Sequence, residues 1–297
     1  MNDKPTRPIL RYHGGKWRIA PWVISHFPAH KVYVEPYGGA GSILLQKTPS
    51  IEEVYNDIDS DVVNVFRVAR DPAKAMRLQE LLELTPYARQ ELEEAYAQNP
   101  CDEIEQARRT IVRAFMGQGS GGATDVTMNG WRSRRKEGNW PVKDWRGYPQ
   151  ELQFFFNRLR FVTIECREAL DLLQRYDAPD TLFYVDPPYL ANTRANQGQN
   201  VYRYEMTDED HVRLAERLHS LSGMVVLSGY DSPLYRDLFK GWAMSCKPTH
   251  ATNLAKRVEC LWISPTVREK GLQHELWHNR RSDPSTQEGA VHIERVQ

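Results

Sequence analysis

An apolar strand that ends in two prolines constrains the fold of this chain more than any other feature. The segment 181–186 (TLFYVD) has the composition of a buried strand, and Pro187 and Pro188 follow it directly. Proline has no backbone N–H, so it cannot continue the ladder of a central strand. The chain must therefore turn at the carboxyl end of this strand, and the turn presents Asp186 and Tyr189.

Short strand segments alternate with helical segments on both sides of this turn. Strands are expected at residues 31–37, 53–55, 161–165, 181–186 and 224–228, with a closing hairpin formed by 241–247 and 257–264. Helices are expected from Ser42, over 61–70, 152–159 and 168–175, and after the capping-box pattern at 207–210. This alternation predicts an α/β fold with a doubly wound, mostly parallel sheet.

A mainly helical segment interrupts the alternation. Residues 73–116 have the composition of two helices, and residues 116–140 are Gly-rich, basic and without periodicity, which predicts a loop or a loose hairpin. We therefore expect a discontinuous domain of residues 1–71 and 161–265 and an inserted domain of residues 72–160. The polar segment 266–297 is expected to be a poorly ordered tail.

The composition excludes several classes of protein. No apolar run of about eighteen residues exists that could span a membrane, and the N-terminus lacks the apolar core of a signal peptide. The cysteines are widely spaced and form no CxxC pair, which predicts reduced thiols in a cytoplasmic protein and argues against a zinc site or a disulfide framework. These cysteines are Cys101, Cys166, Cys246 and Cys260.

The net charge of zero hides a local excess of basic residues. Between Gln106 and Arg160, eleven basic side chains stand against four acidic ones, whereas the segment 80–105 is acidic. An excess of this kind is typical of a surface that binds a polyanion, although a solvated loop is the alternative for each basic residue.

The turn after the buried strand suits an exocyclic amine. Such an amine offers two N–H donors, and the Asp186 carboxylate and the Pro187 carbonyl would supply two acceptors beside each other. The ring of Tyr189 would stack on a base, a contact worth about 1–3 kcal/mol. The alternative is a strand-ending turn with a buried tyrosine.

A second glycine-rich turn follows the strand at 31–37. Gly38, Gly39 and Gly41 allow a ligand to approach the backbone closely, and the sequence does not match the GxGxxG pattern of dinucleotide-binding proteins. A zwitterionic amino-acid group would fit this turn, and Asp57, which ends the next strand, would hold ribose hydroxyls. A tight turn followed by an N-cap is the alternative.

These segments, together with one near the N-terminus, resemble the D12 class (Dam type) of N6-adenine DNA methyltransferases, especially those of phages and prophages. The resemblance runs from Ile9 to Ile263, with segments 228–230 and 257–259 similar to later parts of these enzymes. It is carried by Tyr12-His13-Gly14-Gly15-Lys16, Glu35-Pro36-Tyr37-Gly38-Gly39-Ala40-Gly41-Ser42, Asn56-Asp57-Ile58-Asp59 and Asp186-Pro187-Pro188-Tyr189.

The resemblance implies a Rossmann-like methyltransferase fold, S-adenosylmethionine as methyl donor and a flipped-out adenine of double-stranded DNA as acceptor, without a metal. Catalytic residues would be Asp186, Pro187, Pro188 and Tyr189. The cofactor would be bound by Tyr12, Gly14, Gly15, Lys16, Glu35, Pro36, Gly38, Gly39, Ala40, Gly41, Ser42, Asp57, Glu168 and Asp186. Glu168 departs from the Asp that relatives commonly carry.

The inserted segment would then bind DNA, and the protein would act in the cytoplasm of a bacterial or phage-infected cell as a monomer, or as a dimer on DNA. Phosphate or groove contacts are expected from Arg113, Arg132, Arg134, Arg135 and Lys136.

Other functions stay open at this point. N4-cytosine methylation uses related amine chemistry, but Asp rather than Ser at position 186 favours adenine. RNA is a weaker alternative as acceptor, since no RNA-binding module is visible. A catalytically silent DNA-binding protein of the same fold and a nicotinamide dehydrogenase are further alternatives, and the second conflicts with the glycine pattern.

Overall fold

The computed structural model describes residues 5–97, 102–125, 127–133, 140–193, 203–250, 256–269 and 294–295. The chain folds into two compact units, and each unit is assembled from separate stretches of sequence. The first unit comprises residues 1–21, 38–168 and 200–205, and the second comprises residues 22–37, 169–199 and 206–297. The expected division at residues 72 and 160 is not tested by these units and stays a prediction.

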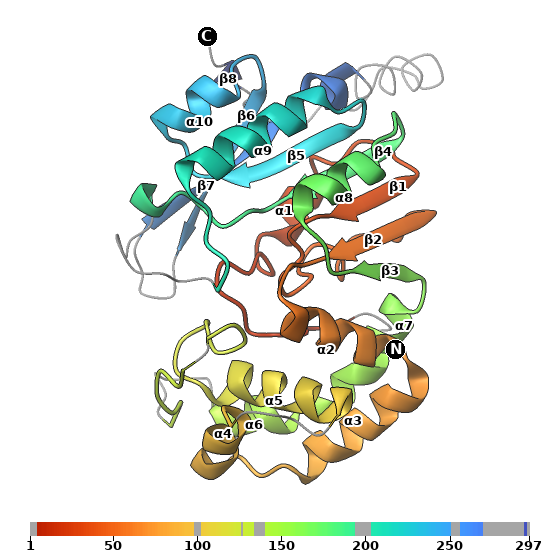
Figure 1. The fold of residues 1–297 in the computed structure, drawn as a ribbon, viewed down its shortest axis with the longest axis vertical. Coiled ribbons are helices and arrows are strands. Elements are labelled where there is room, and N and C mark those ends of the chain that lie inside the picture. The colour runs from red at the N-terminus through yellow and green to blue at the C-terminus, as the bar shows by residue number, and fades with distance from the viewer. Residues whose placement is uncertain are drawn as a thin grey trace, which may run out of the picture. The chain divides into compact units, whose positions relative to one another are not determined.

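The strands follow the order β3-β2-β1-β4-β5-β7-β6-β8 (Figure 1). The pairs β2–β3, β1–β4 and β4–β5 are parallel, and β7 joins β5 and β6 in antiparallel pairs. This is a mostly parallel, Rossmann-like α/β sheet, so the predicted fold class is confirmed. The bounds are β1 Val32–Glu35, β2 Glu52–Asn56, β3 Val162–Glu165, β4 Thr181–Val185, β5 Met224–Gly229, β6 Ala243–His250, β7 Lys256–Ile263 and β8 Glu294–Arg295.

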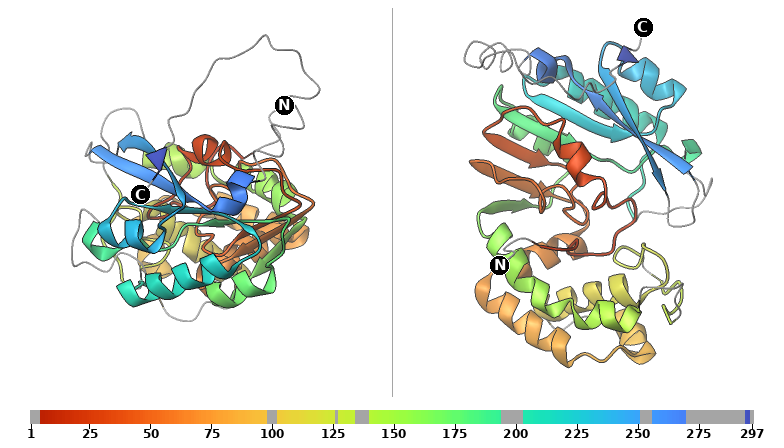
Figure 2. Two further views of the ribbon diagram at one scale, coloured as in Figure 1. Left: turned by 90° about the horizontal axis from the view of Figure 1, so that it is seen from above. Right: turned by 180° about the vertical axis from the view of Figure 1, so that it is seen from behind.

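In the second unit, β4 lies between β1 and β5, and each of its residues is buried. Helices α8 (Ala169–Arg175) and α9 (Asp208–Ser220) cover the face of this sheet that is turned to the viewer in Figure 1. Helix α1 (Ala20–Ile24) lies on the opposite face (Figure 2, right). Coverage of both faces explains why the β4 sequence is continuously apolar.

The first unit combines the β2–β3 pair with a set of helices. Helix α2 packs against α5 and α7, and α3 packs against α2, α5 and α7. Buried apolar side chains on α2 and α5, among them Phe66 and Ile111, supply this packing. The helices are α2 Ser60–Arg70, α3 Pro72–Leu84, α4 Arg89–Ala95, α5 Glu103–Met116, α6 Pro141–Arg146 and α7 Leu152–Leu159, with a 3₁₀ turn at Pro149–Glu151.

Two expectations about helices are wrong. Within its described residues, the segment 73–116 holds three helices instead of two. Pro86 disfavours a helical Thr85, and Asp102 caps a new helix at the backbone N–H groups of Ile104 and Glu105. The segment that begins at Ser42 is a run of turns that ends before Pro49, so no regular helix forms there. Helices α1, α6 and α10 (Pro233–Leu238) were not expected.

The expectation of separate reduced thiols is wrong for one pair of cysteines. Cys246 and Cys260 face each other in register on β6 and β7, with their Cα atoms 4.2 Å apart, and form a disulfide. Cys166 is an exposed free thiol, and Cys101 lies outside the described residues. In the polar segment 266–297, residues 270–293, 296 and 297 also lie outside the described residues. Glu294–Arg295 in this segment forms β8, which pairs with β6.

A buried ion cluster fixes β2 beside the segment that follows the glycine-rich turn. Glu53 accepts hydrogen bonds from Lys47 Nζ at 2.5 Å and from Arg158 Nη1 at 2.5 Å, and Arg158 also donates to the Leu44 carbonyl at 2.6 Å. Burial alone would raise the pKa of Glu53, but Arg158 and Lys47 hold this pKa below its ordinary value. The cluster therefore links β2 to the segment 44–47 and to α7 through buried charged groups.

Replacement of Glu53 by alanine should destabilise the protein strongly, because it leaves Lys47 and Arg158 buried without their carboxylate. We expect Glu53→Ala to lower the free energy of unfolding by about 3–5 kcal/mol in urea denaturation. The control is Glu80→Ala, which removes an exposed ion pair with Arg77 and should cost less than about 1 kcal/mol. Equal losses for the two variants would contradict the anchoring role.

Candidate functional site

The glycine-rich turn of the first unit is tightly constrained. Gly39 and Gly41 have φ angles of 49° and 61°, in the left-handed region that favours glycine. A Cβ atom on Gly38 would lie 2.2 Å from Cε2 of Tyr55, whose hydroxyl donates to the Gly39 carbonyl at 2.6 Å. Tyr55 in turn stacks on Phe66, with ring centroids 3.9 Å apart. Side chains at positions 38, 39 and 41 would therefore disturb the backbone conformation of this turn.

The N-terminal motif packs against this turn. The Tyr12 ring lies over Gly39, where a Cβ atom would stand 3.0 Å from Tyr12 Cε1. Gly14 has a φ of 71°, and the buried Lys16 donates from Nζ to the Gly14 carbonyl at 2.9 Å. Gly15 donates its N–H to the Tyr12 carbonyl at 3.3 Å. The two predicted cofactor segments are thus neighbours within one unit.

Two further residues of the turn, Ala40 and Ser42, are buried. The Ser42 hydroxyl oxygen has no hydrogen-bond partner among the residues that the structure describes. A buried hydroxyl without a partner costs free energy, so it indicates a position where a polar ligand atom would be accommodated.

Asp57 closes the site from the end of β2. Its Oδ2 accepts the Gly39 N–H at 2.9 Å, and its Oδ1 accepts the Asp59 N–H at 2.9 Å. Burial raises the pKa of Asp57 to about 6, and the nearby Asp59 charge adds to the rise, while the two N–H donors oppose it. Each carboxylate oxygen keeps lone-pair capacity beyond these two bonds, so Asp57 can accept ligand hydroxyls.

Glu168 is placed near Asp57 by the Asn56 side chain. Asn56 Nδ2 donates to the Arg167 carbonyl at 3.1 Å, and the Arg167 N–H donates to Asn56 Oδ1 at 2.8 Å. These paired bonds hold the residue before Glu168 beside the residue before Asp57. The first unit contains the predicted residues Tyr12, Gly14, Gly15, Lys16, Gly38, Gly39, Ala40, Gly41, Ser42, Asp57 and Glu168.

The predicted catalytic turn lies in the second unit, together with Glu35 and Pro36. Asp186 directly follows β4, and the neighbouring strand β1 ends at Glu35, which accepts a hydrogen bond from the Tyr33 hydroxyl at 2.5 Å. On the other side, the Tyr184 and Ser228 hydroxyls are 2.8 Å apart. Polar groups from three parallel strands thus gather at the carboxyl ends of those strands.

Two contacts fix the ring of Tyr189. Its hydroxyl donates to Glu259 Oε2 at 2.9 Å, and Tyr230 packs edge-on against it with ring centroids 4.7 Å apart. Burial raises the pKa of Tyr189 well above its ordinary value, and the charges of Asp186 and Glu259 add to this rise. Tyr189 is therefore a neutral hydrogen-bond donor at physiological pH.

The DNA-binding candidates have different surroundings. Arg113 pairs with Asp61 at 3.2 Å and Arg132 pairs with Asp144 at 3.1 Å, and both guanidinium groups are largely buried. Arg108 and Arg158 of the same basic stretch also pair with carboxylates. Much of the local excess of basic residues therefore serves internal ion pairs. Arg134, Arg135 and Lys136 lie outside the described residues.

Within the described residues, no three His, Cys, Asp or Glu side chains are grouped so that they could hold a metal ion. In the same part of the chain, no helix combines the length and apolarity needed to cross a membrane.

Two residues of the site carry no functional signal of their own in the sequence. Glu259 belongs only to a segment that is similar to the family, and Asn56 only to the motif that contains Asp57. Their contacts join positions far apart in the chain, and the folded structure alone reveals these contacts.

Comparison with known proteins identifies a family. The model of the D12 class of N6 adenine-specific DNA methyltransferases matches residues 12–254. The chain is 22% identical to Type II methyltransferase M.MjaIII of Methanocaldococcus jannaschii, over 80% of this chain and 89% of that protein. It is 25% identical to the DNA adenine methylase of Salmonella typhi and 23% identical to that of Escherichia coli, each over 80% of this chain and 85% of the relative.

The glycine-rich turn should tolerate no side chain at position 38. We expect Gly38→Ala to cost about 1–3 kcal/mol of stability, because the new Cβ meets the buried Tyr55 ring. Gly147→Ala is the matched control, since Gly147 has a φ of −84° and its nearest neighbour would lie 3.6 Å from the Cβ. Thermal and urea unfolding would measure both, and a neutral Gly38→Ala variant would refute the close approach.

Proposed function

Because the chain belongs to the D12 class of N6-adenine-specific DNA methyltransferases, we propose that it methylates adenine with S-adenosylmethionine, held at the glycine-rich turn, while the Asp186 turn binds the acceptor amine. The prediction of an adenine-specific DNA methyltransferase is confirmed by the family match and by the named relatives. The observation that carries the division of roles is the gathering of the N-terminal motif, the glycine-rich turn and Asp57 in one cradle.

The residues of this cradle fit S-adenosylmethionine. The positive-φ glycines leave backbone groups open to an amino-acid moiety, and the buried Ser42 hydroxyl offers a further polar contact. Asp57 would accept the ribose hydroxyls, Glu168 would lie toward the adenosine base, and Lys16 would attract the donor's carboxylate. When bound, the donor supplies a methyl group on a sulfonium that needs no further activation.

The Asp186 turn would orient the acceptor. The Asp186 carboxylate and the Pro187 carbonyl would each accept one N–H of the adenine N6 amine, which draws the nitrogen lone pair out of conjugation. The bound donor would supply the methyl group, and the turn would hold N6 toward it with the lone pair free to accept that group. Asp186 would receive the N6 proton that is lost on methylation and pass it to water. Alignment of the reacting atoms supplies much of the acceleration.

The acceptor adenine must leave the duplex to reach this turn, at a cost of a few kcal/mol. Tyr189 would offset part of this cost by stacking on the base, and Glu259 and Tyr230 hold its ring in one orientation beforehand. A preordered ring loses little rotational freedom when the base arrives.

Contacts to DNA phosphates are proposed for Arg134, Arg135 and Lys136. Arg113 and Arg132 would stabilise the DNA-binding region through their internal ion pairs with Asp61 and Asp144. Their role would be to support this region more than to contact the phosphates. The cytoplasm, where a bacterial or phage genome is accessible, is the compartment proposed for the reaction.

The proposed reaction is tested by mass spectrometry of nucleosides. Unmethylated double-stranded DNA is incubated with the purified protein and S-adenosylmethionine and then digested. We expect N6-methyladenine and no N4-methylcytosine. Methylated cytosine would favour the alternative acceptor, and the absence of any methylated nucleoside would favour a silent DNA-binding protein.

Removal of the Asp186 carboxylate should abolish turnover. We expect Asp186→Ala to lower kcat by at least about a hundredfold, with DNA binding largely intact, because only the amine loses its acceptor. Asp180→Ala is the control, since Asp180 is half-exposed, directly precedes the opposite end of the same strand and pairs with Lys31 at 3.3 Å. Full methylation by Asp186→Ala in a single-turnover assay would eliminate the assigned role.

Binding of S-adenosylmethionine should depend on the protonation of Asp57. Because burial raises the pKa of Asp57 to about 6, the carboxylate predominates above that pH and the neutral acid below it. Ribose hydroxyls donate best to the carboxylate, so affinity should fall as the pH drops through about 6, by up to about tenfold per pH unit. Titration calorimetry would measure this, and Asp57→Asn should bind weakly with a flat profile. An unchanged pH dependence in that variant would contradict the role.

A further inference from the structure

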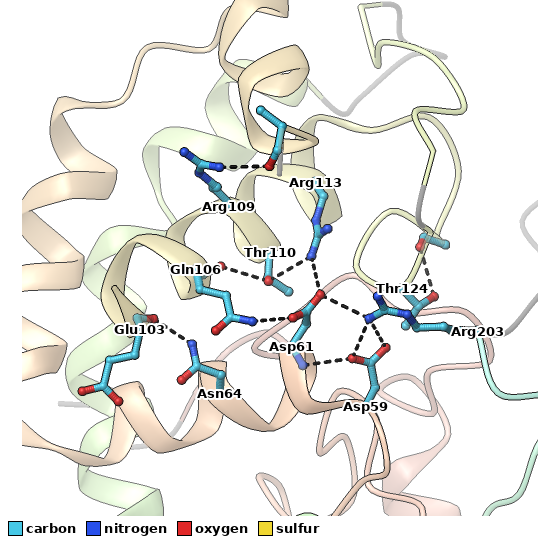
Figure 3. Close-up of polar contacts among 12 residues, drawn as sticks. Asp59, Asp61, Asn64, Glu103, Gln106, Arg109, Thr110, Arg113, Thr124 and Arg203 are labelled. Carbon is cyan, nitrogen blue, oxygen red and sulfur yellow. Dashed lines mark hydrogen bonds and ion pairs between the residues drawn. The ribbon is translucent and has the colours of Figure 1, made fainter. Parts of the chain in front are cut away.

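Arg203 lies in the chain between the catalytic turn and α9, and it reaches two carboxylates at the start of α2 (Figure 3). Its Nη1 is 3.2 Å from Asp59 Oδ1, 3.5 Å from Asp59 Oδ2 and 3.2 Å from Asp61 Oδ2. All three residues belong to the first unit, although Arg203 is separated from Asp59 by 144 positions in the sequence. None of them has a role in the reaction described above.

Asp59 is a buried charge that needs this cation. Its side chain is 2% exposed, whereas that of Arg203 is 34% exposed. Asp59 caps α2 by accepting the Asp61 N–H at 3.0 Å, and in the part of the chain that the structure describes Arg203 is the only cation that pairs with it. Burial raises the pKa of Asp59, and the Arg203 charge opposes this rise. Without Arg203, the carboxylate would stay buried with no opposite charge.

Asp61 is held independently of Arg203. Its Oδ1 accepts a hydrogen bond from Gln106, and its Oδ2 pairs with Arg113 at 3.2 Å, and both of these partners lie on α5 (Figure 3). Arg113 also donates to the Thr110 hydroxyl at 3.2 Å. Arg203 therefore docks on an acidic pair of which one member is already fixed by α5.

Asp59 is linked directly to the proposed ribose-binding carboxylate. Its backbone N–H donates to Asp57 Oδ1 at 2.9 Å, and Asp57 Oδ2 in turn accepts the N–H of Gly39 in the glycine-rich turn. The negative charge of Asp59 also raises the pKa of Asp57. The Arg203 charge can thus affect Asp57 in two ways: it holds the conformation of the turn 57–61, and it offsets the negative charge of Asp59 beside the Asp57 carboxyl.

We propose that Arg203 is a positioning residue for the methyl donor: by neutralising Asp59 it fixes the turn 57–61 and so keeps Asp57 aligned for the ribose. The inference rests on the proposed binding of S-adenosylmethionine at Asp57. It makes donor affinity depend on a residue that follows the catalytic turn in the chain and touches neither the donor nor the acceptor. Loss of Arg203 should weaken donor binding and leave the chemical step unchanged.

The test compares Arg203→Met with Arg203→Lys by titration calorimetry of S-adenosylmethionine without DNA. Because the Arg203 side chain is 34% exposed, we expect Arg203→Met to raise Kd by about three- to tenfold. Arg203→Lys retains the charge and should recover most of the affinity. In steady-state assays, KM for the donor should rise by the same factor, while kcat and KM for DNA change less than about twofold.

Two controls separate positioning from general stabilisation. Arg213→Ala removes an exposed arginine on α9 that pairs with Asp210, and it should leave donor affinity unchanged. In an Asp57→Asn background, Arg203→Met should have a smaller effect on Kd than in the wild type, because the two residues act in series.

The possible results distinguish the inference from the proposed function. If the wild type binds the donor and Arg203→Met binds it equally well, the positioning role of Arg203 is overturned, while the proposed donor site still stands. A lower melting temperature with unchanged Kd would overturn it too, since it would show a purely structural ion pair. A wild type that binds no S-adenosylmethionine would refute the proposed donor site, and the role of Arg203 with it.

Discussion

The end of β4 is the constraint on which the second unit depends. Two prolines follow Asp186, so the ladder that β4 shares with β1 and β5 stops there and the chain must leave the sheet. The same parallel pairing brings the ends of β1 and β5 to this edge, with Glu35 and Ser228. A parallel sheet that is covered on both faces thereby provides a polar edge at the carboxyl ends of its strands, and we propose that the acceptor amine binds at that edge.

Buried carboxylates stabilise the first unit, and their negative charges are balanced in two ways. Glu53 is matched by Lys47 and Arg158, and Asp59 by Arg203. Asp57 relies on backbone N–H donors, and burial raises its pKa to about 6. Among the described residues, no cation pairs with the carboxylate that is proposed to bind the ligand, so its oxygens can accept hydrogen bonds from ligand hydroxyls.

The main features of the fold and of the site could be predicted from local sequence. The apolar run before Asp186, the glycines at positions 38–41 and the capping box at Thr207 are local signals, and the structure has the strand, the turn and the helix at these places. Contacts between distant residues could not be predicted. Tyr189 and Glu259 are 70 residues apart, and the Cys246–Cys260 disulfide depends on the register of β6 against β7. Similarly, the basic stretch gave no sign that Arg113 and Arg132 are partners of Asp61 and Asp144.

We propose that this one chain binds the methyl donor at the glycine-rich turn and the acceptor amine at the Asp186 turn for a single methyl transfer. A crystal structure of the protein with S-adenosylmethionine and a DNA duplex tests it most directly. The account predicts ribose hydroxyls within hydrogen-bond distance of Asp57, the amino-acid moiety against residues 38–42, and an extruded adenine whose N6 faces both Asp186 and the donor methyl. A donor bound away from the glycine-rich turn, or an adenine amine remote from Asp186, would contradict it.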